Sequence, residues 1–243
     1  MNLEILPVAH VPEITSGMNI GECLLDAMRL SDLVLAPSDI VAVTQKIVSK
    51  AEGRTVSLST IEPSSYSISI GRRMLKDPRL VEVIRRESRR IVRMRGEVLI
   101  CETHHGFICA NAGVDQSNVP GSEYVTLLPE DPDRSARGIA RVLGCGVIVT
   151  DTFGRPWREG LVDVAIGLGG VPPFIDFRGS EDCYGHDLKV TLLAAADALS
   201  AAAGLAMGKV ARTPAAVIRG FVWKQSENSA TELLRVPGKD LFL

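Results

Sequence analysis

Apolar residues gather in two kinds of segment along the chain. In one kind they form short runs rich in Val, Ile and Leu, or alternate with polar residues, which predicts strands. The pair around His104-His105-Gly106 also predicts a hairpin. The expected strands are 2–8, 39–43, 97–103, 106–111, 145–151, 213–223 and 162–170, the last ending in a loop.

In the other kind of segment, apolar residues recur three to four positions apart, which predicts helices. One of these, 79–95, carries six arginines from Arg85 to Arg95 and reads as amphipathic. Asp133 or Ser135 would suit as the N-cap of another. The expected helices are 18–33, 79–95, 129–144 and 188–207.

Strands and helices alternate without the regular period of a doubly wound sheet. We therefore expect an α+β fold, with mixed sheets and flanking helices in two intimately packed lobes. Segments 61–67 and 176–186 are candidate loose joins. Residues 1–243 are expected to form a single domain, because no repeat or low-complexity tract divides them.

Composition narrows the function classes. Aromatic residues make up only 5% of the chain, so the core must be aliphatic. A net charge of -2 gives no support to nucleic-acid or membrane binding, and the Ala-rich stretch 191–208 contains Asp197, which favours a buried helix over a membrane span. The five cysteines are odd in number and lack C-x-x-C spacing, which favours a reduced, cytoplasmic protein.

The string VTQKIVSKAEG follows the expected strand 39–43. Lys46 and Lys50 are four residues apart, so on a helical turn they would share a face. Two ammonium groups beside hydroxyls suit a polyphosphate. The alternative is a solvated helix start, and no P-loop signature is present.

A second candidate lies where the strand 145–151 ends. Asp151 and Thr152 offer oxygen ligands for Mg²⁺ or Mn²⁺, and Arg155 and Arg158 could neutralise an anionic substrate. The alternative is a turn in which Asp151 caps the next element and the arginines are solvated.

The polar stretch NAGVDQSNVP, residues 111–120, is a third candidate. Asp115 could be a second metal ligand, and Asn118 could contact a nucleotide base or sugar. Asx-turn chemistry explains the stretch about as well. His104 and His105 are adjacent and would lie on opposite faces of a strand, which makes them a poor metal pair.

Taken in order, these strings resemble one family, the coenzyme F420-0:L-glutamate ligases, which are GTP-dependent gamma-glutamyl ligases of deazaflavin cofactor biosynthesis. The most specific strings are ANAGVDQSNV and DTFGRPWR; others are VTQKIVSKAEGR, FRGSEDCYGHDLKVT, MGKVARTPAAVIRGF and LLRVPGKDLFL. The resemblance covers nearly the whole chain. It is to the single-domain form, without the nitroreductase-like domain that some bacterial members carry after the ligase.

The resemblance implies a reaction and a set of partners. GTP would phosphorylate a carboxylate of coenzyme F420-0, and the amine of L-glutamate would attack the acyl phosphate, releasing GDP and phosphate; further gamma-linked glutamates are possible additions. It also implies two Mg²⁺ or Mn²⁺ ions per site, with K⁺ as a further candidate, and an intertwined homodimer.

Site roles follow from the same resemblance. Asp115 and Asp151 match catalytic, metal-binding positions, and Thr152 matches a metal ligand. Near position 209 some members place a metal-contacting side chain, but an ammonium group cannot ligate a metal, so Lys209 would hold phosphate instead. The implied GTP contacts are Val11, Pro12, Glu13, Ile14, Gln45, Lys46, Lys50, Asn118, Gly208 and Lys209.

Two other functions stay open from the sequence. One is a metal-dependent nucleotide-binding relative without ligase activity, which Lys209 favours. The other is a redox protein that binds the deazaflavin, against which the missing G-x-G-x-x-G fingerprint argues. The number of glutamates added, the choice of metal and the precise precursor are not encoded in any motif.

Overall fold

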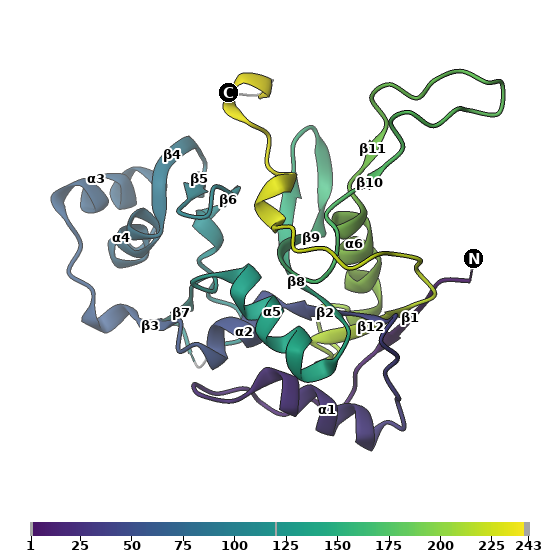
Figure 1. The fold of residues 1–243 in the computed structure, drawn as a ribbon. Coiled ribbons are helices and arrows are strands. Elements are labelled where there is room, and N and C mark those ends of the chain that lie inside the picture. Colours follow the sequence, from purple (N-terminus) through teal and green to yellow (C-terminus); the bar gives the residue numbers. More distant parts are fainter. Residues whose placement is uncertain (1, 120, 241–243) are drawn as a thin grey trace.

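The computed structural model describes residues 2–119 and 121–240, and their fold is α+β, as expected. A mixed five-stranded sheet runs through its centre in the order β1-β12-β2-β8-β9 (Figure 1). Within it β2 and β8 are parallel, and the other neighbours are antiparallel. The strands are β1 (Glu4–Pro7), β2 (Ile40–Thr44), β8 (Gly146–Arg155), β9 (Arg158–Gly169) and β12 (Ala215–Arg219).

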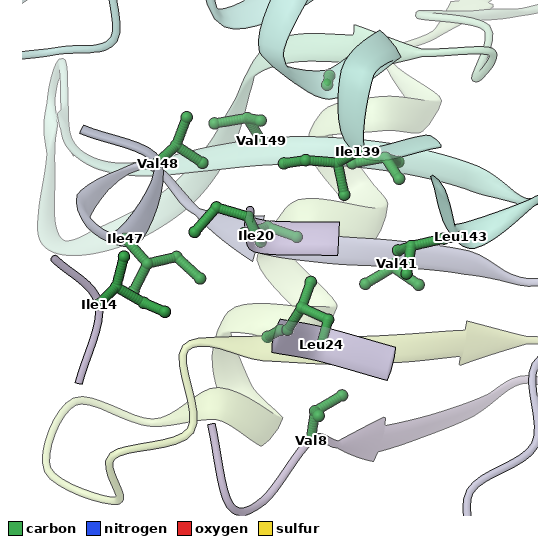
Figure 2. Close-up of a cluster of buried hydrophobic side chains, with 14 of the residues drawn as sticks. Val8, Ile14, Ile20, Leu24, Val41, Ile47, Val48, Ile139, Leu143 and Val149 are labelled. Carbon is green, nitrogen blue, oxygen red and sulfur yellow. The ribbon is translucent and has the colours of Figure 1, made fainter. Parts of the chain in front are cut away.

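Both faces of this sheet are covered, which explains why its central strands are apolar throughout rather than alternating. On one face, Val41 and Val43 of β2 pack in a cluster with helices α1 (Ile20–Leu30), α2 (Gln45–Ala51) and α5 (Pro132–Leu143) (Figure 2). On the other face, Ile40 and Ala42 pack with α6 (Ala195–Met207). The Ala-rich 191–208 stretch is therefore mainly a core helix, as predicted.

A third hydrophobic cluster is built from other elements, which Figure 1 shows to one side of the main sheet. Residues such as Leu58, Ile84 and Leu99 are fully buried in it. Its helices are α3 (Ser65–Met74) and α4 (Pro78–Arg86). Its strands are β4 (Ser88–Arg95), β5 (Val98–Thr103) and β6 (Ile108–Ala110) in one sheet, and β3 (Thr55–Ser57) and β7 (Tyr124–Thr126) in another.

The predicted helix over 79–95 is wrong in its second half. Helix α4 ends at Arg86, and Ser88–Arg95 forms β4. This strand pairs with β5, which is the first strand of the predicted hairpin. Arg90 donates to Glu102 on β5 at 2.7 Å. Pairing with β5 holds this stretch as a largely exposed strand with two register shifts, so tertiary pairing outweighs helical spacing.

Two helix starts also differ from expectation. The N-cap of α5 is Asp131, whose carboxylate accepts from the backbone N–H of Arg134 at 2.9 Å, rather than Asp133 or Ser135. Asp133 instead accepts from the backbone N–H of Leu168 at 2.7 Å. The helix predicted from 188 begins only at Ala195.

Residues before Ala195 belong to an arm. Among the described strands, β10 (Ile175–Asp176) and β11 (Leu192–Leu193) pair only with each other. The segment between them reaches away from the main sheet (Figure 1). Several apolar side chains of this arm are exposed, Tyr184 and Val190 by more than four fifths.

Two further sequence expectations can be compared with this fold. Across the described residues, no helix combines the length and the apolar character that crossing a membrane would require. All five cysteines lie within the described ranges and are free, but only Cys101 and Cys109 are buried, whereas Cys183 is exposed.

Candidate functional site

The parallel pair β2 and β8 brings two of the three candidate stretches together. Thr44, the last residue of β2, lies opposite Thr150 of β8. Lys46 and Asp151 therefore follow at the same edge of the sheet. Helix α2 begins immediately after β2, so Lys46 and Lys50 lie one turn apart on one face, as their spacing predicts.

Asp115, from the third stretch, reaches the same edge. Its backbone forms a bridge with Thr126, and the Lys46 Nζ donates to its Oδ2 and to the Ser117 carbonyl oxygen, the latter at 2.9 Å. The Ser117 N–H donates to Asp115 Oδ1 at 2.7 Å. Burial raises the pKa of Asp115, but the hydrogen bonds from Lys46 and Ser117 outweigh it and hold the pKa below its usual value.

Asp151 has the opposite electrostatic character. Burial raises the pKa of its carboxyl to about 7, and only the Thr152 N–H, at 2.8 Å from Oδ1, strongly opposes this. The nearby charges of Asp115 and Asp163 also raise the pKa of Asp151, whereas Lys46 lowers it. Three carboxylates therefore act on one another at this edge.

Asp163 is a site residue that the sequence reasoning missed. It lies on β9 opposite Thr152 and accepts from the Thr152 hydroxyl at 2.6 Å. Its side chain is only 5% exposed. The available signal was a charged residue inside an otherwise apolar strand, VDVAIGLG, because a buried charge needs a dedicated partner.

Lys209 supplies that partner. Its Nζ lies 2.8 Å from both Asp163 Oδ1 and Thr152 Oγ1. Helix α6 can approach Asp163 because residue 204 is glycine: a Cβ there would lie 2.3 Å from Asp163 Oδ2. Gly208 ends α6 at φ 63° and ψ −171°, a conformation open essentially to glycine alone, and so directs the chain toward Lys209.

The other residues that the sequence predicts to contact the nucleotide differ in their exposure to solvent. Lys50 forms an ion pair with Glu13 at 2.5 Å, which joins the VPEI turn to α2. Pro12 and Asn118 are exposed, and Val11 is partly buried. Ile14 and Gln45 are buried: Ile14 packs in the core (Figure 2), and Gln45 accepts from the Ser49 hydroxyl at 2.8 Å. Their side chains therefore shape the site from behind.

The oxygen atoms at this sheet edge determine which metal ions the site could hold. Among residues 2–119 and 121–240, no three His, Cys, Asp or Glu side chains converge as a metal-holding group. Asp115, Asp151 and the Thr152 hydroxyl are nevertheless hard oxygen donors at one sheet edge. Such a set fits Mg²⁺ or Mn²⁺ that takes its other ligands from water and phosphate, the usual case for Mg²⁺ in phosphoryl-transfer sites.

Other sequence candidates have local roles. Arg155 donates to the carbonyl oxygens of Glu159 and Gly160 in its own hairpin. The two histidines each bond a backbone carbonyl: His104 that of Arg86 at 2.8 Å, and His105 that of Glu130 at 3.1 Å. The structure does not bring these three side chains together.

Comparison with known proteins matches this whole region. The family model described as F420-0:Gamma-glutamyl ligase matches residues 9–220. A coenzyme F420:L-glutamate ligase of Methanopyrus kandleri is 43% identical over 99% of this chain and 97% of its own length. A protein of the same name from Methanothermobacter thermautotrophicus is 41% identical over 100% of this chain and 99% of its own length. Another, from Methanocaldococcus jannaschii, is 35% identical over 89% of this chain and 91% of its own length.

Proposed function

Since this chain belongs to the F420-0:gamma-glutamyl ligase family, we propose that it adds L-glutamate to coenzyme F420-0 and consumes GTP in doing so. The observation that carries the proposal is the cluster of carboxylates and lysines at the end of β2 and around Asp151 of β8. Lysines suit phosphates, and carboxylates suit the cations that accompany them. The cluster is therefore chemically suited to a nucleoside triphosphate.

The proposed reaction has two steps. A carboxylate oxygen of coenzyme F420-0 attacks the γ-phosphorus of GTP, the bond to the β-phosphate oxygen breaks, and GDP leaves. The amine of L-glutamate then attacks the acyl phosphate carbon, the amide bond forms, and phosphate leaves while the nitrogen loses a proton. Further rounds on the product would add gamma-linked glutamates.

The residues of the chain bind and orient in this scheme. Lys46 and Lys50 exchange their ion pairs with Asp115 and Glu13 for GTP phosphate oxygens. Lys209 faces the same anions from the segment that follows α6. Asp115, Asp151 and Thr152 would hold a divalent cation, which would supply charge neutralisation at the phosphoryl group. Asp163 positions Thr152 and Lys209 through its two hydrogen bonds. No side chain needs to act as a covalent nucleophile.

We also propose that the protein forms a homodimer, and the arm supports this. Val190 is 87% exposed and Tyr184 is 85% exposed. Both lie in the arm between β10 and β11, two strands that pair with each other. Exposed apolar side chains on a projecting hairpin are typical of a surface that a partner covers. A second copy is the partner that the family resemblance implies.

The central experiment tests the reaction directly. Purified protein is incubated with coenzyme F420-0, L-glutamate, GTP and Mn²⁺, and both GDP and the glutamylated product are measured. We expect the two to form in equal amounts, and no glutamylated product to form when L-glutamate is replaced by its deaminated analogue, 2-oxoglutarate. Product formation with ATP but not with GTP would contradict the proposed nucleotide.

One observation favours a second candidate function, a metal-dependent nucleotide-binding protein without ligase activity. Lys209 occupies the oxygen atoms of Asp163 and Thr152 that would otherwise be open to a cation. The same incubation separates the two functions. GTP binding without any glutamylated product would support the second candidate and overturn the ligase proposal.

A further inference from the structure

A cavity of about 660 Å³ lies far from the carboxylate cluster. Gly146, the first residue of β8, and Gly169, the last residue of β9, both line it. Asp151 is five residues further along β8, which corresponds to roughly 17 Å of extended chain. The cavity is therefore at the opposite end of these strands and has its own lining.

Three arginines of α5 give this cavity its character. Arg134, Arg137 and Arg141 all line it, and their spacing places them on one helical face. Arg134 pairs with Glu130 at 3.2 Å. Within the part of the chain that the structure describes, Arg137 and Arg141 make no ion pair or hydrogen bond through their side chains.

The positive charge of the cavity wall is poorly balanced. Glu227 is the one acidic residue among its described lining residues. Arg141 lies in the last turn of α5, where the helix dipole favours a cation, but Arg134 and Arg137 lie before that turn and gain little from it. The helix dipole thus accounts for Arg141 and the ion pair with Glu130 accounts for Arg134, which leaves Arg137 unexplained.

Trp223 forms another wall and is fixed in place. Its indole Nε1 donates to the Ser38 carbonyl oxygen at 2.9 Å. The ring packs over Gly146, where a Cβ would lie 2.9 Å from a ring carbon. A second hollow, of about 420 Å³, also borders Trp223, so the ring stands between two open spaces. An indole ring whose position is fixed, as that of Trp223 is, can stack against a planar group of a ligand that nearby guanidinium groups bind.

We propose that this cavity is a second small-molecule site, which takes a polyanion with phosphate or carboxylate groups. Arg137 and Arg141 contact the anionic groups, since guanidinium forks match phosphate and carboxylate bidentately. Trp223 contacts a ring where the ligand has one. The cavity volume lies within the range usual for sites of metabolite-sized ligands, roughly 300–1,000 Å³. This site is independent of the proposed ligase reaction.

Trp223 itself provides a local readout. The chain has two tryptophans, so Trp157→Phe leaves Trp223 as the single indole reporter. Inorganic pyrophosphate, which has no ring and no reactive partner here, is titrated into this protein at low ionic strength. We expect a saturable fluorescence change, which Arg137→Gln/Arg141→Gln shifts to at least about tenfold higher pyrophosphate concentration.

A matched control keeps the net charge equal. Arg29→Gln/Arg72→Gln removes two exposed arginines outside the cavity and should leave the titration unchanged. The proposal is overturned if Trp223 fluorescence does not respond up to about 10 mM pyrophosphate, or if both double variants behave alike. If Trp157→Phe does not fold, calorimetry on the otherwise unchanged protein must show one pyrophosphate site that only Arg137→Gln/Arg141→Gln removes.

Discussion

The turn that carries Asp115 and the strand that carries Asp151 bring two carboxylates to one sheet edge in opposite electrostatic states. Asp115 receives hydrogen bonds from Lys46 and from Ser117, which hold its pKa low. Asp151 receives one strong backbone hydrogen bond, and burial raises its pKa to about 7. The turn thus stabilises its anion without a ligand, whereas the strand leaves its anion short of positive charge.

The two regions also differ in backbone conformation. No residue of β8 has a positive φ, whereas Asn111, Ala112 and Gly113 are all left-handed. The Oδ1 of Asn111 is buried and finds no hydrogen-bond partner among the described residues. A non-glycine residue held in that region costs on the order of 1 kcal/mol or more. Gly113 is required there, since a Cβ would lie 2.6 Å from Leu128. The turn carries strain that the strand does not.

The largest expected effect comes from the strand. Asp151→Asn keeps the shape of the side chain but removes the charge that a cation would meet, so we expect ligase turnover to fall by about a thousandfold or more. Product formation under saturating GTP and Mn²⁺ measures this. Asp26→Asn, on the exposed face of α1, is the control and should keep full activity. Turnover within a few-fold of the unchanged protein would remove Asp151 from the site.

The turn should respond through GTP affinity instead. Lys46→Gln removes the proposed phosphate contact and the main donor to Asp115, so we expect GTP binding to weaken by about a hundredfold. Calorimetric titration with GTP in the presence of Mg²⁺ measures the dissociation constant. Arg29→Gln, which removes an exposed ion pair with Asp26 at 2.7 Å, should leave it unchanged. Equal GTP affinity in both variants would contradict the role of Lys46.

Stability against pH separates the two carboxylates without any substrate. The folded pKa of Asp151 lies above its unfolded value of about 4, so its stabilising contribution is full below about pH 4 and is lost as the pH rises to about 7. At about 1.4 kcal/mol per pKa unit, the loss is roughly 4 kcal/mol. The folded pKa of Asp115 is lowered, so its contribution is present above about pH 4 and is lost below.

Denaturation in EDTA at several pH values tests this assignment. Asp151→Asn removes the carboxyl, so the variant should be more stable than the unchanged protein at about pH 8, and the difference should shrink toward zero near about pH 4. Asp26→Asn again serves as control. A stability difference that is the same at every pH would show that Asp151 titrates normally.

Sequence patterns predicted those parts of this site that depend on residues close together in the chain. The spacing of Lys46 and Lys50, and the apolar run that leads to Asp151, depend on neighbours in the chain. The predicted end of that strand at Asp151 is wrong, because pairing with β9 extends β8 to Arg155. The family resemblance pointed to Asp115. Neither indicated Asp163, because its role depends on two contacts that are distant in sequence. It lies opposite Thr152 on the neighbouring strand, and it accepts a hydrogen bond from Lys209, which follows α6 and is 46 residues further along the chain. Likewise β4 was predicted as helix because its pairing with Glu102 on β5 is a tertiary contact.

Lys209 gives the smallest expected effect and the finest test of the comparison. Its side chain is 60% exposed, and its ammonium group donates to Asp163 and Thr152 as that of Lys46 donates to Asp115, but neither of these two bonds reaches Asp151. Lys209→Gln frees those oxygens and removes a positive charge, so Mn²⁺ should bind about three- to tenfold more tightly, measured from free Mn²⁺ by electron paramagnetic resonance. Lys76→Gln removes the same charge elsewhere and should leave Mn²⁺ affinity unchanged. If Lys209→Gln instead weakens Mn²⁺ binding, then Lys209 organises Asp163 and Thr152 for the cation rather than competing with it.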